Sequence, residues 1–292
     1  MPYCTGIAGA RHICALLDHV IEIVEPGPLV TVQDLGRRGY RALGVTRSGA
    51  FDVAAHSLAN RLVGNSPEAA TLEITFGGLT FRTHSAATLA LTGARCPGLD
   101  SGAAITVAAG TLIRLGTPEH GLRSYLAVRG GIAVDPVLGS RSTDTLGALG
   151  PPALKAGDRL PIGSDPPSEV SGIAATPIRR LPRLRIVLGP RADWFSARAL
   201  NVLTSTAWIV GADSNRIGVR LDGAPLTRVH GEELISEPTL PGALQVPPDG
   251  RPILLGPDAP VTGGYPVICV VRRGDLDIAA QLRPGDGLTF RT

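Results

Sequence analysis

Alternating apolar and polar residues run along most of the chain and predict short, half-buried β-strands. The alternation begins at Ile21, in the stretches IEIVEPG and LVTVQDLGRRG, and each stretch contains a glycine where a turn is expected. Further stretches of the same kind are LEITF, LTFRT, ATLALTG, AITVAAG, TLIRLG and YLAVRGG. Because little chain separates them, they favour hairpins or a barrel over crossovers through helices.

Two stretches have helical spacing instead. The first helix is expected between Phe51 and Leu62, and Gly64 supplies a left-handed stop. The second is expected between Trp194 and Leu203, after the strand RLRIVLGP. With 37 glycines and 25 prolines, much of the remaining chain disfavours helices, so the expected class is mainly β.

The composition of residues 164–182 is typical of an interdomain linker, with four prolines and few large apolar side chains. We therefore expect an N-terminal tail at residues 1–20, an N-terminal domain at residues 21–163 and a C-terminal domain at residues 183–292. The tail holds one short apolar stretch that is too short and too polar for a signal peptide or a membrane span.

Two similar endings indicate a repeat. The stretches AGDRLPI around Asp158 and PGDGLTF around Asp286 lie 286 − 158 = 128 positions apart. Two related domains of about that size would explain the spacing. The alternative is that G-D-x-L is a common turn before a final strand.

Charge and cysteine content exclude several classes of protein. The formal net charge is only +3, and the basic residues are scattered, which argues against a nucleic-acid partner. Four distant cysteines without a C-x-x-C pair favour reduced, cytosolic thiols. The sequence lacks the motifs of esterases, zinc proteases, dinucleotide sites and P-loops, and its six histidines show no metal-ligand spacing, so we expect no metal site.

Polar groups gather around the first predicted helix. Arg37, Ser48 and Gly49 precede it and Asp52 lies at its start, where a helix offers free amide donors to an anion. The alternative is that Ser48 or Asp52 caps the helix and Arg37 pairs with Asp34.

Two polar residues follow that start. Asn60 lies near the end of the helix and Glu73 in the following strand, where alternation places Glu73 and Thr75 on one face. These residues either line a pocket beside the helix or form a solvated strand surface.

Two more polar segments occur in the C-terminal half. Ser214, Arg216 and Arg220 surround a turn, and guanidinium groups suit carboxylate or phosphate binding. For this segment alone, two exposed arginines on a hairpin are the simpler explanation. The other segment follows Asp258 and is a glycine pair flanked by two polar residues. The glycines either let the backbone approach a ligand closely or form a wide hairpin. Its residues are Thr262, Gly263, Gly264 and Tyr265.

Together these segments resemble the carboxyltransferase family that includes the C subunit of 5-oxoprolinase, allophanate hydrolase subunit 2 and the matching domain of urea carboxylase. The resembling stretches run in order from about Ile21 to the C-terminus: VQDLGRRGYRALGV, SGAFD, LANRLVGN, LEIT, LALTGA, YLAVRGGI, LGSRST, SNRIGVRLDG, PPDGRPILLGPDAPVTGGYP and AAQLRPGD. Members usually have Met where Phe51 stands, and often Asp and Met where Asn215 and Ile217 stand. These departures concern the substrate rather than the fold.

The resemblance implies two tandem cyclophilin-like β-barrel domains with one or two short helices each. It also implies a cytoplasmic subunit of an ATP-dependent 5-oxoprolinase, which opens 5-oxoproline to glutamate. The partners would be a companion B subunit that is similar to allophanate hydrolase subunit 1, and possibly an A subunit. ATP with Mg would be shared with the partner. No A-M-K-M segment occurs, so covalent biotin is not expected on this chain.

Two alternative functions stay open. One is a carboxyltransferase or allophanate hydrolase component of urea or amide metabolism, which would need a separate biotin carrier. The other is a non-catalytic protein that binds the inhibitor of a sensor kinase. From residue chemistry and family-like position we expect Arg37, Arg216 or Arg220 to hold the substrate carboxylate or phosphate. We expect Asp52 or Asp258 to transfer a proton.

Overall fold

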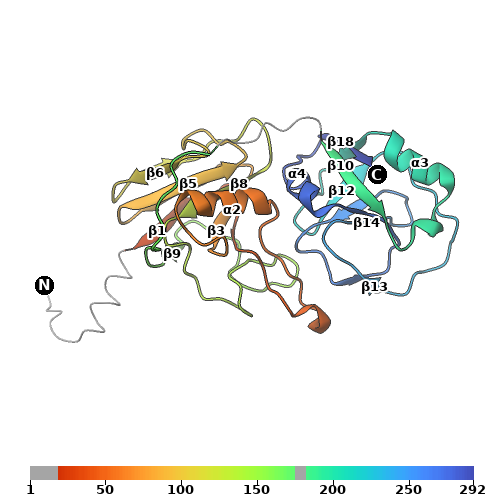
Figure 1. Ribbon diagram of the computed structural model, residues 1–292, viewed down its shortest axis with the longest axis horizontal. Coiled ribbons are helices and arrows are strands. Elements are labelled where there is room, and N and C mark those ends of the chain that lie inside the picture. Colours follow the sequence, from red (N-terminus) through yellow and green to blue (C-terminus); the bar gives the residue numbers. More distant parts are fainter. Residues whose placement is uncertain (1–18, 175–181) are drawn as a thin grey trace, which may run out of the picture. The chain divides into compact units, whose positions relative to one another are not determined.

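The computed structural model describes residues 19–174 and 182–292, and the chain forms two compact units (Figure 1). The described part of the first unit consists of residues 19–34, 54–137 and 151–174. The second unit consists of residues 35–53, 138–150 and 182–292. The mainly β class expected from the sequence is confirmed. The second unit therefore includes two stretches that precede the predicted linker at residues 164–182.

The expected tail at 1–20 and linker at 164–182 fall partly on residues 1–18 and 175–181, which lie outside the described residues. Both stay predictions. In the part of the chain that the structure describes, no helix is both long and apolar enough to cross a membrane.

The first unit contains two antiparallel sheets around one apolar core. The four-stranded sheet has the order β7 (Leu112–Arg114), β4 (Thr80–Thr83), β1 (Val20–Glu25), β9 (Arg159–Pro161). The five-stranded sheet has the order β2 (Leu29–Gln33), β3 (Thr71–Thr75), β8 (Arg123–Val128), β5 (Ala87–Gly93), β6 (Ala104–Val107). The predicted alternation explains the core, because Leu72 and Ile74 of β3 belong to it while Glu73 between them does not.

Helix α2 (Val53–Leu62) covers the other face of the five-stranded sheet (Figure 1). Its His56 ring lies 2.9 Å from the Thr71 hydroxyl and packs edge-on against Tyr125 of β8. The helix ends at a glycine with φ of 75°, as expected from the sequence. It begins two residues later than expected, because the Phe51 side chain packs into the core of the second unit. Phe51 therefore fits the helical spacing in the sequence without being part of α2.

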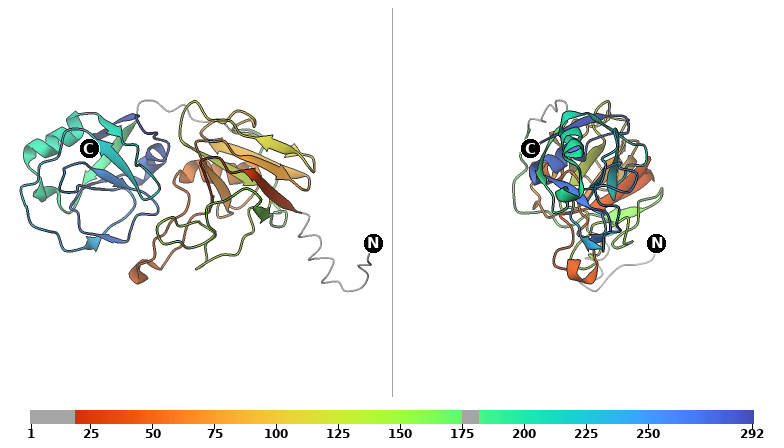
Figure 2. Two further views of the ribbon diagram at one scale, coloured as in Figure 1. Left: turned by 180° about the vertical axis from the view of Figure 1, so that it is seen from behind. Right: turned by 90° about the vertical axis from the view of Figure 1, so that its right-hand side faces the viewer.

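The second unit is a closed barrel of seven strands, seen from behind in Figure 2. Its strand order is β10 (Arg183–Leu188), β17 (Val267–Val271), β14 (Ala243–Gln245), β15 (Ile253–Leu255), β12 (Gly218–Asp222), β11 (Trp208–Val210), β18 (Gly287–Arg291). The parallel pairing of β10 with β18 closes the barrel, and every other neighbouring pair is antiparallel. A two-stranded sheet of β13 (Glu237–Pro238) and β16 (Thr262–Gly263) accompanies it.

Short helices pack on the barrel. In α3 (Ala197–Ser205) the Ser196 side chain caps the first turn by accepting from the Ala199 amide, and Leu203 enters the barrel core beside Trp208. The second helix was expected to begin at Trp194, but that residue ends the 3-10 turn η2 (Ala192–Trp194). The short helix α4 (Leu276–Ala279) follows the turn η3 (Arg273–Asp275), and η1 spans Arg41–Leu43.

The G-D-x-L turn recurs in both units with the same hydrogen bonds. Asp158 accepts from the Lys155 amide at 2.7 Å, and Asp286 accepts from the Arg283 amide at 2.8 Å. Each carboxylate therefore fixes a tight turn before the last strand of its unit. The strand pairing differs, since β9 pairs with one antiparallel strand and β18 joins a parallel and an antiparallel neighbour. The two endings therefore share one turn, as both explanations of the sequence similarity expect.

Candidate functional site

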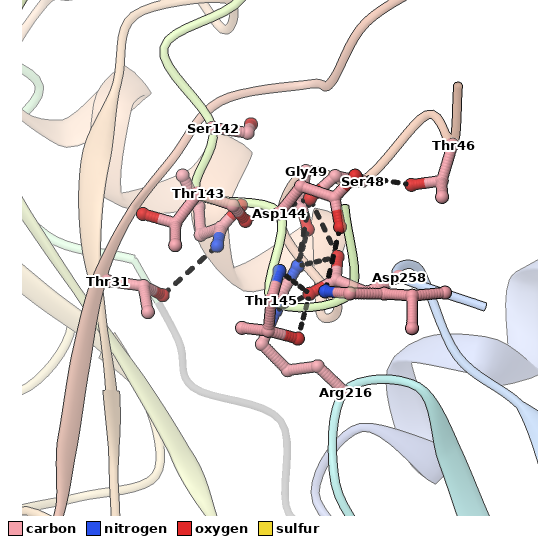
Figure 3. Close-up of polar contacts among 12 residues, drawn as sticks. Thr31, Thr46, Ser48, Gly49, Ser142, Thr143, Asp144, Thr145, Arg216 and Asp258 are labelled. Carbon is pink, nitrogen blue, oxygen red and sulfur yellow. Dashed lines mark hydrogen bonds and ion pairs between the residues drawn. The ribbon is translucent and has the colours of Figure 1, made fainter. Parts of the chain in front are cut away.

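The predicted site residues Ser48, Arg216 and Asp258 meet within the second unit, although 210 positions separate Ser48 from Asp258. They come from the loop before α2, the turn before β12 and the loop after β15. Figure 3 shows Ser48, Thr145 and Arg216 converging on Asp258. We call these four residues the Asp258 cluster.

The Asp258 carboxylate accepts five hydrogen bonds. Oδ1 accepts from Ser48 Oγ at 2.7 Å and Arg216 Nη2 at 2.8 Å. Oδ2 accepts from Arg216 Nε at 2.9 Å, from the Thr145 amide at 3.0 Å and from the Thr145 hydroxyl at 2.7 Å. Arginine therefore binds the carboxylate with both prongs of its fork, the strongest geometry for such a pair.

The ion pair of Arg216 and Asp258 is buried and stays charged. Arg216 and Asp258 have side chains that are only 2% and 0% exposed. Burial by itself would raise the pKa of Asp258, but the Arg216 charge and the hydrogen bonds from Arg216, Ser48 and Thr145 hold it below its usual value. A carboxylate with five donors and a low pKa is a poor proton acceptor. The contacts therefore favour a positioning role for Asp258.

The backbone around Ser48 is held in an unusual conformation. Ser48 has φ of 53° and Gly49 has φ of 92°, both in the left-handed region. The Ser48 hydroxyl also contacts the Thr143 carbonyl at 2.9 Å, and Arg216 Nη2 donates to the Gly49 carbonyl at 2.7 Å. A non-glycine residue in this region costs roughly 1 to 2 kcal/mol, so these contacts offset a local strain.

The loop at residues 138–150 supplies partners that the sequence reasoning missed. Asp144 accepts from the Thr46 hydroxyl at 3.2 Å and from the amides of Leu146 and Gly147. The predicted binding residue Arg37 donates through Nη2 to the Ser142 carbonyl. The stretch LGSRST at the start of this loop was the available signal, but no spacing rule connects it with Ser48 or Asp258.

Asp52, the other predicted catalytic carboxylate, makes different contacts. Gln281 Nε2 donates to its Oδ2 at 2.8 Å, and Asp52 is fully buried. The next residue is bound as well, since Asp277 Oδ1 accepts from the Val53 amide at 2.8 Å. The structure thus brings Ser48, Gly49, Arg216 and Asp258 together and gives Asp52 other partners.

In the first unit, Asn60 and Glu73 lie in a buried polar layer between α2 and the five-stranded sheet. The Asn60 amide donates to the Ala69 carbonyl at 2.7 Å. Glu73 accepts from the Tyr125 hydroxyl at 2.7 Å, and Arg123 Nε lies 3.4 Å from its other oxygen. His56 lies in the same layer, and burial lowers its pKa. Its imidazole is therefore neutral at neutral pH.

The remaining predicted residues lie elsewhere on the second unit. Arg220 is exposed on β12, and its backbone amide donates to the Ser214 hydroxyl at 3.0 Å. Thr262 and Gly263 form β16, and the Tyr265 carbonyl accepts from Gln245 Nε2 at 3.1 Å. A Cβ at Gly263 would lie 2.7 Å from that same nitrogen, so the glycine allows the close approach. The Tyr265 side chain is 44% exposed.

Among residues 19–174 and 182–292, no group of three or more histidine, cysteine, aspartate or glutamate side chains could hold a metal ion. Of the predicted site residues, Arg220, Thr262 and Tyr265 have exposed polar side chains, and Thr145 of the Asp258 cluster is exposed as well.

Comparison with known proteins gives matches over most of the chain. The family model for the carboxyltransferase domain, subdomain A and B, matches residues 43–292. The chain is 41% identical over 283 residues to the C subunit of 5-oxoprolinase from Escherichia coli, and the match covers 93% of this chain and 90% of that protein.

Two solved structures are also similar. TTHA0988 matches with a TM-score of 0.85 and 36% identity over 94% of this chain. The urea carboxylase of Kluyveromyces lactis matches with a TM-score of 0.88 and 29% identity, also over 94% of this chain. This chain spans only 56% of the first of these structures and 27% of the second.

Proposed function

Because the chain belongs to the carboxyltransferase domain family of subdomains A and B, we propose that it is a component of an ATP-dependent 5-oxoprolinase. The observation that carries this proposal is the 41% identity to the C subunit of the Escherichia coli enzyme over nearly the whole length of both proteins. The complex would act in the cytoplasm with a companion B subunit and possibly an A subunit. ATP and Mg would be shared with the companion protein.

The proposed reaction needs activation of an unreactive amide. Amide resonance makes the lactam of 5-oxoproline a poor electrophile, and phosphorylation of its oxygen creates a leaving group. Water then opens the ring, giving glutamate, ADP and phosphate. Positioning and stabilisation of charge are the contributions a protein makes to such a step.

The Asp258 cluster supports a positioning role in this reaction. It ties the loop at Ser48 and the loop at Thr145 to the barrel through one ionised carboxylate. Thr145 is exposed while its hydroxyl and amide are both held, so its surroundings are fixed in position at the protein surface. We propose that exposed Arg220 supplies a guanidinium to the carboxylate or phosphate of the substrate.

Reconstitution tests the proposal. The chain is mixed with its two companion proteins, and release of ADP is measured with and without 5-oxoproline. We expect ADP release that depends on 5-oxoproline and yields glutamate, and a lower rate for Arg220→Ala than for the control Arg198→Ala on the exposed face of α3. A complex that assembles but shows no such ATP hydrolysis contradicts the proposal and favours a regulatory binding role.

A second function is favoured by the match to the Kluyveromyces lactis urea carboxylase. In this alternative the chain transfers a carboxyl group from carboxybiotin to urea or a related amide, with biotin on a separate carrier. Avidin blotting of the purified complex distinguishes the two functions, because only the carboxyltransferase needs a biotinylated chain. A biotin-free complex with bicarbonate-independent activity excludes this alternative.

A further inference from the structure

A hollow of about 830 Å³ opens on the second unit, away from the contacts of the Asp258 cluster. Its lining residues come from three segments, at 225–228 with 230–234, at 248–250 and at 264–265. It includes two predicted binding residues, Gly264 and Tyr265, but its charged groups were not recognised in the sequence. These charged groups define what the hollow can bind.

Arg228 supplies the cation. Its Nη2 donates to the Val246 carbonyl, and its buried Nε meets no acceptor among the described residues. No carboxylate of the described chain forms an ion pair with it. Burial lowers the pKa of the guanidinium from its usual value, which reflects a charge that is partly removed from water without a compensating anion. A bound anion would remove this cost.

Three carboxylates lie on the rim of the same hollow: Glu232, Glu233 and Asp249. All three are exposed. Asp249 attracts the Arg228 charge electrostatically but forms no ion pair with it, and its Oδ1 accepts from the Arg251 amide at 3.0 Å. Opposite charges therefore face one hollow without neutralising each other. A phosphate would carry two negative charges towards three acids, and Coulomb repulsion disfavours it.

We propose that this hollow binds an α-amino acid as a zwitterion, with its carboxylate on Arg228 and its ammonium group on the acidic rim beside Asp249. Such a ligand carries one negative and one positive charge on a small molecule, which matches the guanidinium and the carboxylates that line the hollow. Pro225, Pro248 and the half-exposed Tyr265 ring provide apolar wall for the rest of the molecule. A charge-assisted bond to the guanidinium supplies most of the affinity.

This inference deepens the proposed function. Only the choice of glutamate as the probe rests on that function. Opening the lactam creates an ammonium group that 5-oxoproline lacks, so the hollow would distinguish the product of that reaction from its substrate. Binding and turnover are separate measurements, so failure of one is distinguishable from failure of the other.

Titration calorimetry of the full chain with L-glutamate, 5-oxoproline and glutarate tests the inference. Glutarate has both carboxylates of glutamate but no ammonium group. We expect glutamate to bind at least about tenfold more tightly than the other two, since each lost charged contact costs about that factor. Equal affinity for the three compounds overturns the zwitterion, and no binding of any overturns the site.

Two variants assign the contacts. Arg228→Gln should weaken glutamate binding about tenfold or more, while the matched control Arg198→Gln on α3 leaves it unchanged. Asp249→Asn should reduce the preference for glutamate over glutarate without weakening glutarate. Circular dichroism confirms that each variant is folded, and the second variant tests the site even if the first does not fold. Unchanged glutamate affinity in Arg228→Gln refutes the inference.

Discussion

Replacing Asp258 by asparagine tests whether the Asp258 cluster holds the second unit together. The substitution keeps the shape of the side chain but removes its negative charge. If the amide nitrogen takes the place of Oδ2, it faces three donors, namely Arg216 Nε and the amide and hydroxyl of Thr145. The reversed orientation still leaves a donor facing Ser48 and Arg216 Nη2.

The expected loss of stability is large because Arg216 stays behind. Its side chain is 2% exposed, so its charge remains buried without a counter-ion. Breaking a buried ion pair by removing one partner costs about 3 to 5 kcal/mol. The surface pair of Asp222 with Arg251 provides a matched control in the same unit, since these side chains are 53% and 63% exposed. Asp222→Asn should cost less than about 1 kcal/mol.

Urea denaturation followed by tryptophan fluorescence measures these effects. Both tryptophans of the chain, Trp194 and Trp208, lie in the second unit, so their emission reports on that unit alone. A loss below about 1 kcal/mol for Asp258→Asn, or one equal to that of Asp222→Asn, refutes the predicted cost of breaking the buried pair.

The same stability difference can be measured as a function of pH. The pKa of Asp258 is lower in the folded protein than in the unfolded chain, so its contribution is fully present above the unfolded pKa and is lost as pH falls through the folded value. The stability difference between wild type and Asp258→Asn should therefore shrink below about pH 4. Asp275, whose pKa the Arg185 hydrogen bond also lowers, is common to both proteins and cancels in the difference.

Three further substitutions or reagents test other contacts. Ser48→Ala should destabilise the second unit by about 1 kcal/mol more than Ser48→Gly in urea denaturation, because glycine relieves the positive φ of 53° and alanine does not; equal losses contradict the strain. Gly256→Ala places a Cβ 2.1 Å from the Arg216 carbonyl oxygen and should lower the free energy of unfolding by more than about 2 kcal/mol in calorimetry. The control Gly172→Ala meets nothing within 4 Å and should change it by no more than about 0.5 kcal/mol. Burial raises the pKa of the Cys269 thiol, so iodoacetamide at pH 8 should label it only after unfolding, as mass spectrometry of the peptide would show; rapid labelling of the folded chain argues against the buried position.

Local pattern was enough to predict the strands but not what covers them. The alternation along β3, TLEIT, separates Leu72 and Ile74, which enter the core, from Thr71 and Glu73. It could not show that α2 lies over Thr71 and Glu73, because a buried polar face and a solvated polar face have the same period. Glu73 therefore became a candidate for a pocket or an open surface, whereas the structure gives it Tyr125 and Arg123 as neighbours.

The two arginines of SNRIGVRLDG show a different limit. Four residues apart on a strand, they would share a face. Strand β12 begins only at Gly218, so Arg216 lies in the turn before it and alternation does not apply there. Arg216 turns inward to Asp258 while Arg220 stays exposed. The partners Ser48 and Thr145 lie far away in the sequence, and no periodic pattern connects residues that meet only through the fold.

The burial of the Asp258 cluster also decides where reactive groups should be sought. An ion pair with little exposure contributes little net stability once its desolvation is counted, yet it fixes the geometry of every chain segment that donates to it. Here those segments are the loop at Ser48, the loop at Thr145 and the turn at Arg216, and all meet at one carboxylate. A group so completely bound cannot exchange protons with a substrate without first losing these contacts. Chemistry in an assembled enzyme should therefore involve the exposed neighbours of the cluster, with Asp258 acting through the positions it gives them.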